Sequence, residues 1–165
     1  MRLVVQRVKE AQVIIDNKEY SSIKQGFLIY LGITHTDTPE DVIKYADKVK
    51  KLRVFSDSEG KMNLNIDAVG GEFLVVSQFT LYGTTKGYNR PSFIEAAKPE
   101  HGEKLYNLFV EKINESHRCK TGIFGADMNI VSINDGPVTI LIDSINDWQI
   151  IGFSLLLSYN LISLW

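Results

Sequence analysis

Four consecutive apolar residues, Phe73 to Val76, begin the stretch that most constrains how this chain can fold. A short apolar run without alternation is typical of a strand buried on both faces, so it predicts a central strand of a sheet. Polar Ser77, Gln78 and Thr80 follow, before a loop rich in Gly, Lys and Asn. Because sites are often built where a buried strand leaves the core, this strand end is the first candidate for a functional site.

Alternate side chains of a strand point to opposite faces, which places Ser77 with Phe79 on one face and Gln78 with Thr80 on the other. Both hydroxyl groups enter one pocket only if a bulge or the strand end turns one of them. The alternative is that Ser77 and Thr80 bond neighbouring backbone at a frayed strand end. Strand chemistry alone leaves both interpretations open.

Composition narrows the class of protein. The chain has 165 residues, 44% hydrophobic and 23% charged, so we expect one domain with a core of its own. A formal net charge of -2 provides no broad basic field, so any contact with RNA should be local. Cys119 is the only cysteine and the apolar run within Met1–Arg7 is short for a signal peptide, so we expect a cytoplasmic protein.

Strands are predicted before the central run. Met1–Val8 and Ala11–Ile15 are rich in β-forming residues, and Asp16-Asn17 predicts a tight turn after them. Gly26–Ile33 is a further continuous apolar strand. The first part of the chain should therefore form a sheet that opens with a hairpin.

Two helices are predicted from their start signals. Thr38 is a candidate N-cap before a proline and two acids, and Lys98-Pro99-Glu100 starts the second helix in a similar way. The first helix carries its apolar face on Val42, Tyr45, Ala46, Val49 and Leu52. The second carries its apolar face on Leu105, Leu108, Phe109 and Ile113. Residues 62–69 are predicted to be mostly irregular.

Two last strands, Met128–Ile133 and Val138–Ile142, are predicted on either side of Asn134-Asp-Gly-Pro137. The residues alone favour a turn at a sheet edge with an ordinary trans bond before Pro137. Tight turns between most strands favour an antiparallel or mixed sheet over a doubly wound one. We therefore predict an α+β fold, a barrel-like antiparallel or mixed sheet with two main helices packed on one side.

Familiar catalytic signatures are absent from the sequence, which contains no phosphate-binding glycine loop, no G-x-S-x-G and no H-E-x-x-H. His35, His101 and His117 have no cysteine or carboxylate at metal-ligand spacing, so we expect no metal, no cofactor and surface roles for them. A Ser-His-Asp triad that assembles in space stays open. Cys119 is interpreted as an ordinary thiol.

Two longer motifs, Ser77-Gln-Phe-Thr-Leu81 and Asn134-Asp-Gly-Pro-Val-Thr139, resemble the motif pair of the D-aminoacyl-tRNA deacylase family. Shorter stretches match as well: Gln6-Arg7-Val8, Leu52-Arg-Val-Phe-Ser-Asp57, Gly60-Lys-Met-Asn-Leu-Asn65, Arg90-Pro-Ser-Phe93 and Gly125-Ala-Asp-Met128. The resemblance covers residues 1–143, which we expect to form the deacylase domain. Residues 144–165 have no counterpart and are treated as an apolar C-terminal extension.

The resemblance implies a homodimer whose site lies at the boundary between subunits. Ser77, Gln78 and Thr80 would form the catalytic part of a pocket for the 3′-terminal aminoacyl-adenosine of tRNA. Phe79 and Met128 would contact the substrate.

The second motif would supply a chiral filter. The resemblance implies that Gly136 and Pro137 are joined by a cis bond and enter the pocket of the partner subunit. Our own hypothesis adds that Lys86 and Arg90, followed by Pro91 in the loop after the first motif, meet acceptor-end phosphates.

The implied reaction is hydrolysis of the ester between a D-amino acid and the tRNA ribose. Such an ester is already activated, so placement of water and stabilisation of the oxyanion suffice. Thr80 has no histidine or lysine close in sequence, so we favour water assisted by the RNA 2′-hydroxyl over attack by Thr80. A backbone wedge that excludes L side chains would admit glycine, so glycyl-tRNA should also be hydrolysed.

Two rival functions stay open: a module that only binds an RNA end or nucleotide, and a hydrolase of another small ester acting through Thr80.

The apolar segment 150–165 is short for a membrane span and interrupted by polar groups. We expect it to cover an apolar patch or extend the dimer contact, without stable membrane association.

Overall fold

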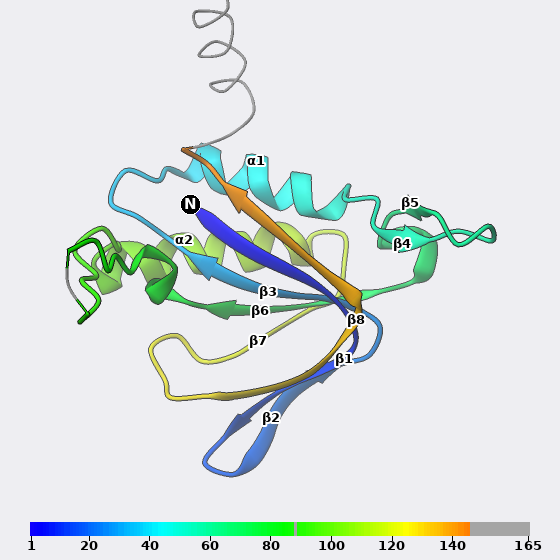
Figure 1. Cartoon of the computed structure of the whole chain (residues 1–165), viewed down its shortest axis with the longest axis horizontal. Helices are drawn as coiled ribbons and strands as arrows, with labels where there is room; N and C mark the ends of the chain where they lie inside the picture. The colour runs from blue at the N-terminus through cyan, green and yellow to red at the C-terminus, as the bar shows by residue number, and fades with distance from the viewer. Residues whose placement is uncertain (88, 146–165) are drawn as a thin grey trace, which may run out of the picture.

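A six-stranded mixed sheet, curled towards a barrel and carrying two helices on one side, forms the body of the molecule (Figure 1). The structure is a computed structural model that describes residues 1–87 and 89–145. The expected role of the C-terminal extension thus lies almost wholly outside the described residues. Within these ranges, no helix has the length and apolar character needed to cross a membrane.

The order of elements follows the prediction in outline. The main sheet contains β1 (Arg2–Ile15), β2 (Lys18–Ile23), β3 (Gly26–Gly32), β6 (Glu72–Ser77), β7 (Cys119–Thr121) and β8 (Asn129–Asp143). The helices are α1 (Pro39–Lys50) and α2 (Pro99–Asn114), with short 3-10 helices η1 (Asp67–Val69) and η2 (Phe79–Tyr82). A separate small hairpin consists of β4 (Phe55–Ser56) and β5 (Met62–Leu64). The predicted α+β class is confirmed.

Strand β1 is the spine of the sheet. Its first half pairs with β3 and its second half with β2, while β8 pairs along its length on the other edge. The prediction of two separate strands before Ile15 is wrong, because β1 is one continuous strand. Register shifts in its pairing with β8 let it continue past the exposed Lys9 and Glu10. The turn after it is confirmed: Asp16 and Asn17 have φ values of 50° and 61°, as in a tight hairpin.

The turn predicted at Asn134–Pro137 is also wrong, because β8 is one strand. Gln6 pairs with Thr139 and Val8 with Asn134, so five steps along β8 face only two along β1. The extra residues form a bulge in the strand. The sheet bends there without ending, as the corner of β8 in Figure 1 shows.

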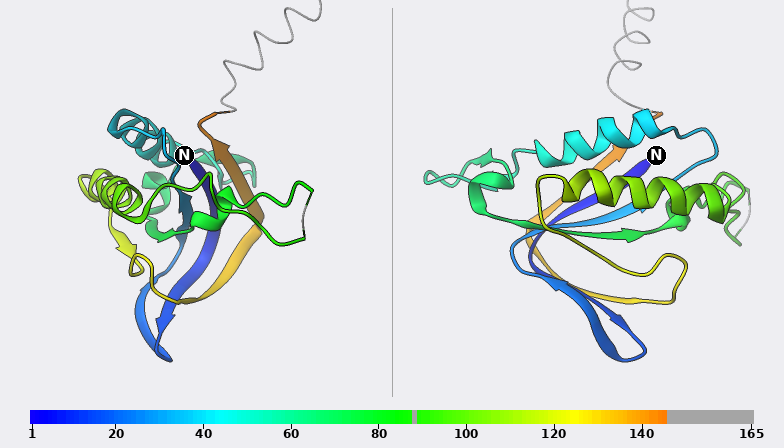
Figure 2. Two further views of the ribbon diagram at one scale, coloured as in Figure 1. Left: turned by 90° about the vertical axis from the view of Figure 1, so that its left-hand side faces the viewer. Right: turned by 180° about the vertical axis from the view of Figure 1, so that it is seen from behind.

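Both helices begin where their sequences predict. The Thr38 hydroxyl accepts from the Asp41 amide and the Asp41 side chain accepts from the Thr38 amide, which forms a capping box at the N-terminus of α1. Pro39 and Pro99 occupy the first turns of α1 and α2. The helices contact each other and cover one face of the sheet (Figure 2).

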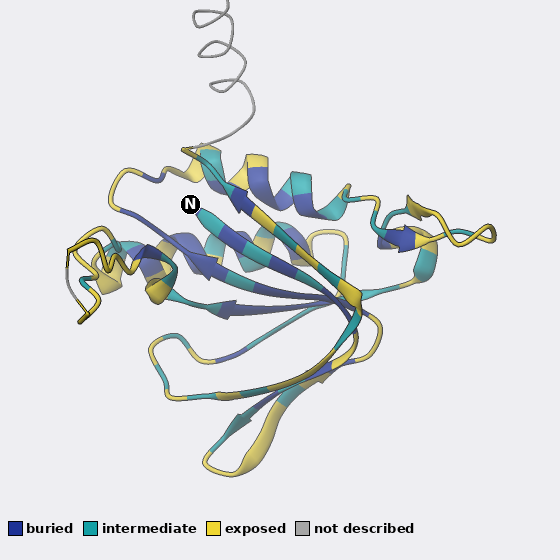
Figure 3. Ribbon diagram, viewed as in Figure 1, coloured by how far each residue is buried: buried dark blue, intermediate teal, exposed yellow. Residues whose placement is uncertain are grey.

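The central strand β6 is buried on both faces, as its apolar run predicts (Figure 3). Phe73 and Val75 belong to the core under the helices, whereas Leu74 and Val76 belong to a second core inside the curl of the sheet. Strand β3 lies parallel to β6 on one side and β7 lies parallel on the other. This arrangement brings the carboxyl ends of β3 and β6 together, next to the loop before α2.

Candidate active site

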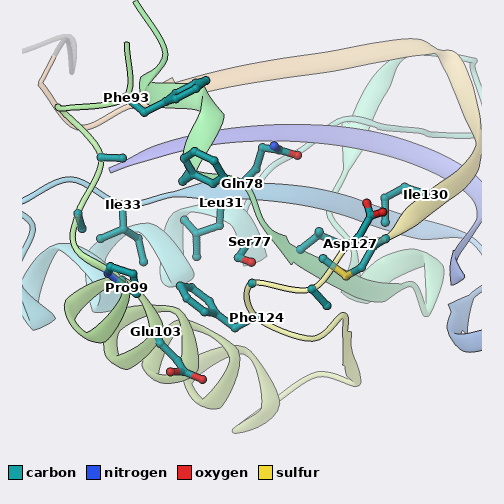
Figure 4. A pocket seen from close by; sticks show the side chains of 18 residues that line it. Leu31, Ile33, Ser77, Gln78, Phe93, Pro99, Glu103, Phe124, Asp127 and Ile130 are labelled. Carbon is teal, nitrogen blue, oxygen red and sulfur yellow. The ribbon is translucent and has the colours of Figure 1, made fainter. Parts of the chain in front are cut away.

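A cavity of about 710 Å³ opens at the carboxyl ends of β3 and β6 (Figure 4). A volume in this range suits a small organic ligand. Its lining comes from β3, the end of β6, η2, the loop before α2, α2 itself, the loop before β8 and the start of β8: Leu31, Ile33, Val76, Ser77, Gln78, Phe79, Phe93, Ala96, Ala97, Pro99, Gly102, Glu103, Phe124, Gly125, Ala126, Asp127, Met128 and Ile130.

The first motif forms one side of this cavity because the strand ends at Ser77. The Gln78 amide donates to the Leu31 carbonyl at 2.8 Å, and the chain then turns into η2. Alternation therefore stops, and the predicted division of the residues after Ser77 between two faces is wrong. Ser77, Gln78 and Phe79 all line the cavity, which the sequence allowed only if the strand end turned.

Thr80 occupies a different position. Its side chain is exposed and it does not line the cavity, although it is next to Phe79 in η2. The Gln78 side-chain amide donates to the Thr80 hydroxyl oxygen at 2.5 Å. The hydroxyl is thus held beside the cavity by an amide donor, and not by a group that could take its proton.

Aromatic and thioether side chains form the walls. Phe79 and Phe93 meet edge to face, with ring centroids 5.1 Å apart. Phe93 lies on the side of the cavity opposite Phe124 in Figure 4. Gly83 leaves room for this pair, since a Cβ there would lie 2.8 Å from the Phe93 ring. Met128, implied by the resemblance, lines the cavity as well.

Several wall residues were missed by the sequence prediction. Phe93, Phe124 and Pro99 come from separate loops or a helix start, so no single motif contains them. An available signal was Phe93 itself, the aromatic residue that ends the family-like stretch Arg90-Pro-Ser-Phe93 in a polar loop. Exposed aromatic residues of this kind often mark binding surfaces.

The loop between η2 and α2 connects two elements that line the cavity. Thr84 and Ser92 exchange two backbone hydrogen bonds of 2.9 Å within this loop. Lys86 and Arg90 are exposed on it. Both side chains are therefore open to solvent.

Charged groups at the cavity are few. Within the described part of the chain, the charged lining residues are Glu103 and Asp127, both exposed, and neither a histidine nor a lysine lines the cavity. His35 and His101 bond the Ile94 and Asp37 carbonyl oxygens at 2.7 and 3.1 Å. The cavity therefore offers hydroxyl, amide and aromatic groups without an evident strong base.

A Ser-His-Asp arrangement does form elsewhere. The His117 ring lies 2.7 Å from the Ser116 hydroxyl and 2.8 Å from the Asp67 carboxylate. None of the three lines the cavity, and Ser116 and Asp67 are exposed at the surface. His117 instead packs edge to face on Phe73, which indicates a structural role for its ring.

Cys119 carries a free, partly buried thiol. Burial raises the pKa of the Cys119 thiol to about 12, so it stays protonated near neutral pH and is a poor nucleophile. No group of three or more His, Cys, Asp and Glu side chains that could hold a metal ion occurs in residues 1–87 and 89–145.

The second motif is exposed and yet fixed by side chains. The Gly136-Pro137 bond is cis, as the resemblance implied, and both residues lie on the surface. Arg7 donates to the Asp135 carbonyl at 3.1 Å and to the Val54 carbonyl at 2.5 Å from beneath the bulge. The Asn134 side chain accepts from the Val138 amide at 2.9 Å across it.

This bulge does not line the cavity of its own chain. The bend of β8 lies towards β4 and β5, whereas the loop after η2 lies at the other end of the sheet (Figure 1). The structure thus brings together Ser77, Gln78, Phe79 and Met128, and leaves Thr80 beside them and the Gly136-Pro137 pair apart.

Comparison with known proteins identifies relatives of this chain. A family profile described as D-Tyr-tRNA(Tyr) deacylase matches residues 4–143. The D-aminoacyl-tRNA deacylase of Cytophaga hutchinsonii is 55% identical over 148 residues, covering 88% of this chain and 99% of that protein. The protein of the same name from Thermotoga petrophila is 52% identical over 145 residues, covering 87% and 97%.

Two solved structures share the fold of this chain. A structure titled c-Myc DNA Unwinding Element Binding Protein aligns with a TM-score of 0.82 at 40% identity, covering 87% of this chain and 99% of that one. One titled as a probable eukaryotic D-amino acid tRNA deacylase aligns with a TM-score of 0.74 over 86% and 98%, and its 17% identity supports a shared fold alone. With the profile spanning residues 4–143 and relatives above 50% identity, the chain belongs to the D-aminoacyl-tRNA deacylase family of hydrolases.

Proposed function

We propose that this protein hydrolyses the ester bond of D-aminoacyl-tRNA, releases the free amino acid and tRNA, and so proofreads chirality during translation. The observation that carries the proposal is the cavity whose one side is the first family motif, Ser77 to Phe79, and whose walls are aromatic. Aromatic walls suit stacking of a terminal adenosine, and the polar strand end suits the ester. We expect this activity in the cytoplasm.

We propose that water, assisted by the 2′-hydroxyl of the RNA, attacks the ester carbonyl. Ser77 and Gln78 supply a hydroxyl and an amide at the cavity that can orient water and stabilise the oxyanion. The lack of a lysine or histidine among the described lining residues supports a mechanism without an enzyme nucleophile.

Substitution of Thr80 tests this mechanism. A Thr80→Ala enzyme is expected to keep kcat within about 5-fold of wild type. In the proposed mechanism the Thr80 hydroxyl neither attacks the ester nor transfers a proton, so its loss removes no reacting group. Single-turnover hydrolysis of D-tyrosyl-tRNA measures it, with mass spectrometry of the quenched enzyme as a second readout. An acyl group trapped on Thr80 would contradict the proposal.

We propose that chirality is imposed by exclusion in a homodimer. The exposed Gly136-Pro137 bulge of one subunit would enter the cavity of the other and occupy the space that an L side chain needs. Its surface position, together with the side-chain bonds that fix it, supports this role. Backbone that is held in place before binding excludes a ligand better than a flexible loop does.

A substrate comparison tests the function as a whole. In single-turnover assays we expect fast hydrolysis of D-tyrosyl-tRNA and glycyl-tRNA, and L-tyrosyl-tRNA slower by at least about 100-fold. Resistance of glycyl-tRNA would contradict exclusion, because glycine has no side chain to exclude. Absence of hydrolysis would favour an RNA-end-binding module, and equal rates for both tyrosyl enantiomers would favour a general esterase.

Other parts of the chain receive roles within the same proposal. Lys86 and Arg90 are exposed in the loop that follows η2, and we propose that they contact acceptor-end phosphates. Residues 1–143 would form the catalytic domain. Residues 144–165 would be dispensable for chemistry, and the chain would not associate stably with membranes.

A further inference from the structure

The η2 turn, which carries Phe79 to the cavity, is held from behind by Arg2. The Arg2 Nη1 atom donates to the Leu81 carbonyl oxygen at 2.9 Å, and the guanidinium carbon lies 4.6 Å from the centroid of the Tyr82 ring. Leu81 and Tyr82 are the last two residues of η2. One side chain from the first strand therefore contacts the end of the turn that begins at the candidate active site.

The start of the turn is fixed by other contacts. The Gln78 amide is bonded to the Leu31 carbonyl at 2.8 Å, and a Cβ on Gly32 would lie only 3.0 Å from the Leu81 side chain. Strand β3 and its last residue, Gly32, therefore contact the residue before η2, Gln78, and pack closely against Leu81 within it. The short 3-10 helix has few bonds of its own, so the bond from Arg2 at its far end fixes its tilt.

Arg2 is itself oriented by β8. Its Nε atom bonds the Asp143 carboxylate at 3.0 Å, and the two residues are direct partners in the β1–β8 ladder. The Tyr82 ring lies under the guanidinium and is buried. A planar guanidinium can make both bonds and the ring contact together, which a lysine ammonium cannot.

We propose that Arg2 is a positioning residue for the deacylation: it sets the η2 turn so that Phe79 and the adjoining groups meet the reacting ester in the right place. Arg2 itself lines no part of the cavity. The far walls of the cavity, such as Phe124, are not part of η2, so the stacking surface that they offer to the terminal adenosine stays in place without Arg2. Loss of Arg2 therefore lowers kcat and leaves KM nearly unchanged, because small misplacements of reacting groups cost rate.

This inference rests on the proposed function and is tested by steady-state kinetics with D-tyrosyl-tRNA. Arg2→Ala is expected to lower kcat by about 30-fold and to change KM by less than about 2-fold. Arg53→Ala is the matched control, since Arg53 donates to the Asn63 carbonyl at 2.7 Å in the β4–β5 hairpin, away from the cavity. Its kinetic constants should equal those of wild type.

Chemical rescue separates positioning from a general loss of stability. Guanidinium chloride at non-denaturing concentration should restore part of the kcat of Arg2→Ala, whereas ammonium chloride at equal ionic strength should not. A kcat equal to wild type, a rise in KM alone, or a loss that follows the unfolded fraction in thermal melts would each overturn the inference.

A conservative variant keeps the test decisive if Arg2→Ala does not fold. Arg2→Lys retains the charge and the stem but cannot bond Leu81 and Asp143 together, so its kcat should fall by about 10-fold at unchanged KM. A Lys variant with wild-type kcat would contradict the inference. If the wild-type protein hydrolyses no D-tyrosyl-tRNA, the proposed function fails; if it does and the Arg2 variants match it, only the role of Arg2 fails.

Discussion

Replacing Gly136 by alanine is expected to lower the ratio of D-tyrosyl-tRNA to L-tyrosyl-tRNA hydrolysis by about 100-fold. Gly136 has a φ of 131°, a region that residues with a Cβ rarely adopt. The added Cβ would lie 2.7 Å from the Val138 side chain and 3.1 Å from Arg7 Nη2. The bulge must therefore move, and under the proposed exclusion mechanism a displaced bulge would no longer fill the space that an L side chain needs.

Gly60→Ala is the matched control for this variant. Gly60 also has a positive φ of 79°, but a Cβ there meets no atom within 4 Å. The control carries backbone strain of about 1 kcal/mol in the exposed loop between β4 and β5, away from the cavity, and should keep its selectivity. Single-turnover rates for both enantiomers measure the ratio. A Gly136→Ala enzyme with wild-type selectivity would contradict a role of the Gly136-Pro137 bulge in chiral selection.

Arg7→Ala is expected to lower the free energy of unfolding by about 3 kcal/mol. The Arg7 side chain is 9% exposed and bonds the Val54 carbonyl at 2.5 Å and the Asp135 carboxylate at 3.1 Å. Its removal leaves a partly buried carbonyl and a partly buried carboxylate without their cationic partner, and both lose hydrogen bonds. Urea denaturation at fixed protein concentration measures the change.

Arg53→Ala serves as the control, because Arg53 is exposed and its loss should cost less than about 1 kcal/mol. The loss in the free energy of unfolding for Arg7→Lys should lie between those for Arg7→Ala and Arg53→Ala. One ammonium group cannot bond both Val54 and Asp135 at the places that the Arg7 guanidinium reaches. A midpoint for Arg7→Ala equal to that of Arg53→Ala would show that the guanidinium contributes no net stability to the bulge.

Elements with local signals were predictable from the sequence. The helix from Pro39 to Lys50 followed from Thr38, which caps it, and from an apolar face at helical spacing. The buried strand ending at Ser77 followed from its continuous apolar run. In each case the residues that decide the structure are neighbours in the chain, so sequence patterns report them directly.

Elements decided by distant partners were not predictable. Asn134–Pro137 contains the composition of a turn, and only pairing with β1 shows that the chain continues as a bulged strand. The three-residue strand at Cys119–Thr121 and the β4–β5 hairpin are too short to show a period. Their pairing depends on β6 and on each other.

The residues of the candidate site also divide into those with a local sequence signal and those brought together only by folding. Ser77, Gln78 and Phe79 were identified by a motif, whereas the opposite walls come from loops that meet only in the folded chain. Thr80 was expected in the pocket and lies beside it, because the 3-10 turn rotates it out. A buried arginine in an apolar strand, Arg7, was the overlooked signal for a fixed bulge.

Mixed dimers test most directly whether each site is built from two subunits. A Ser77→Phe protomer, whose cavity is filled, is combined through two affinity tags with a Gly136→Ala protomer, whose bulge is displaced. The account predicts that the first homodimer is inactive and the second unselective, while the mixed dimer regains D-selective hydrolysis at one of its two sites. Mixed dimers with the same poor selectivity as the Gly136→Ala homodimer would contradict it.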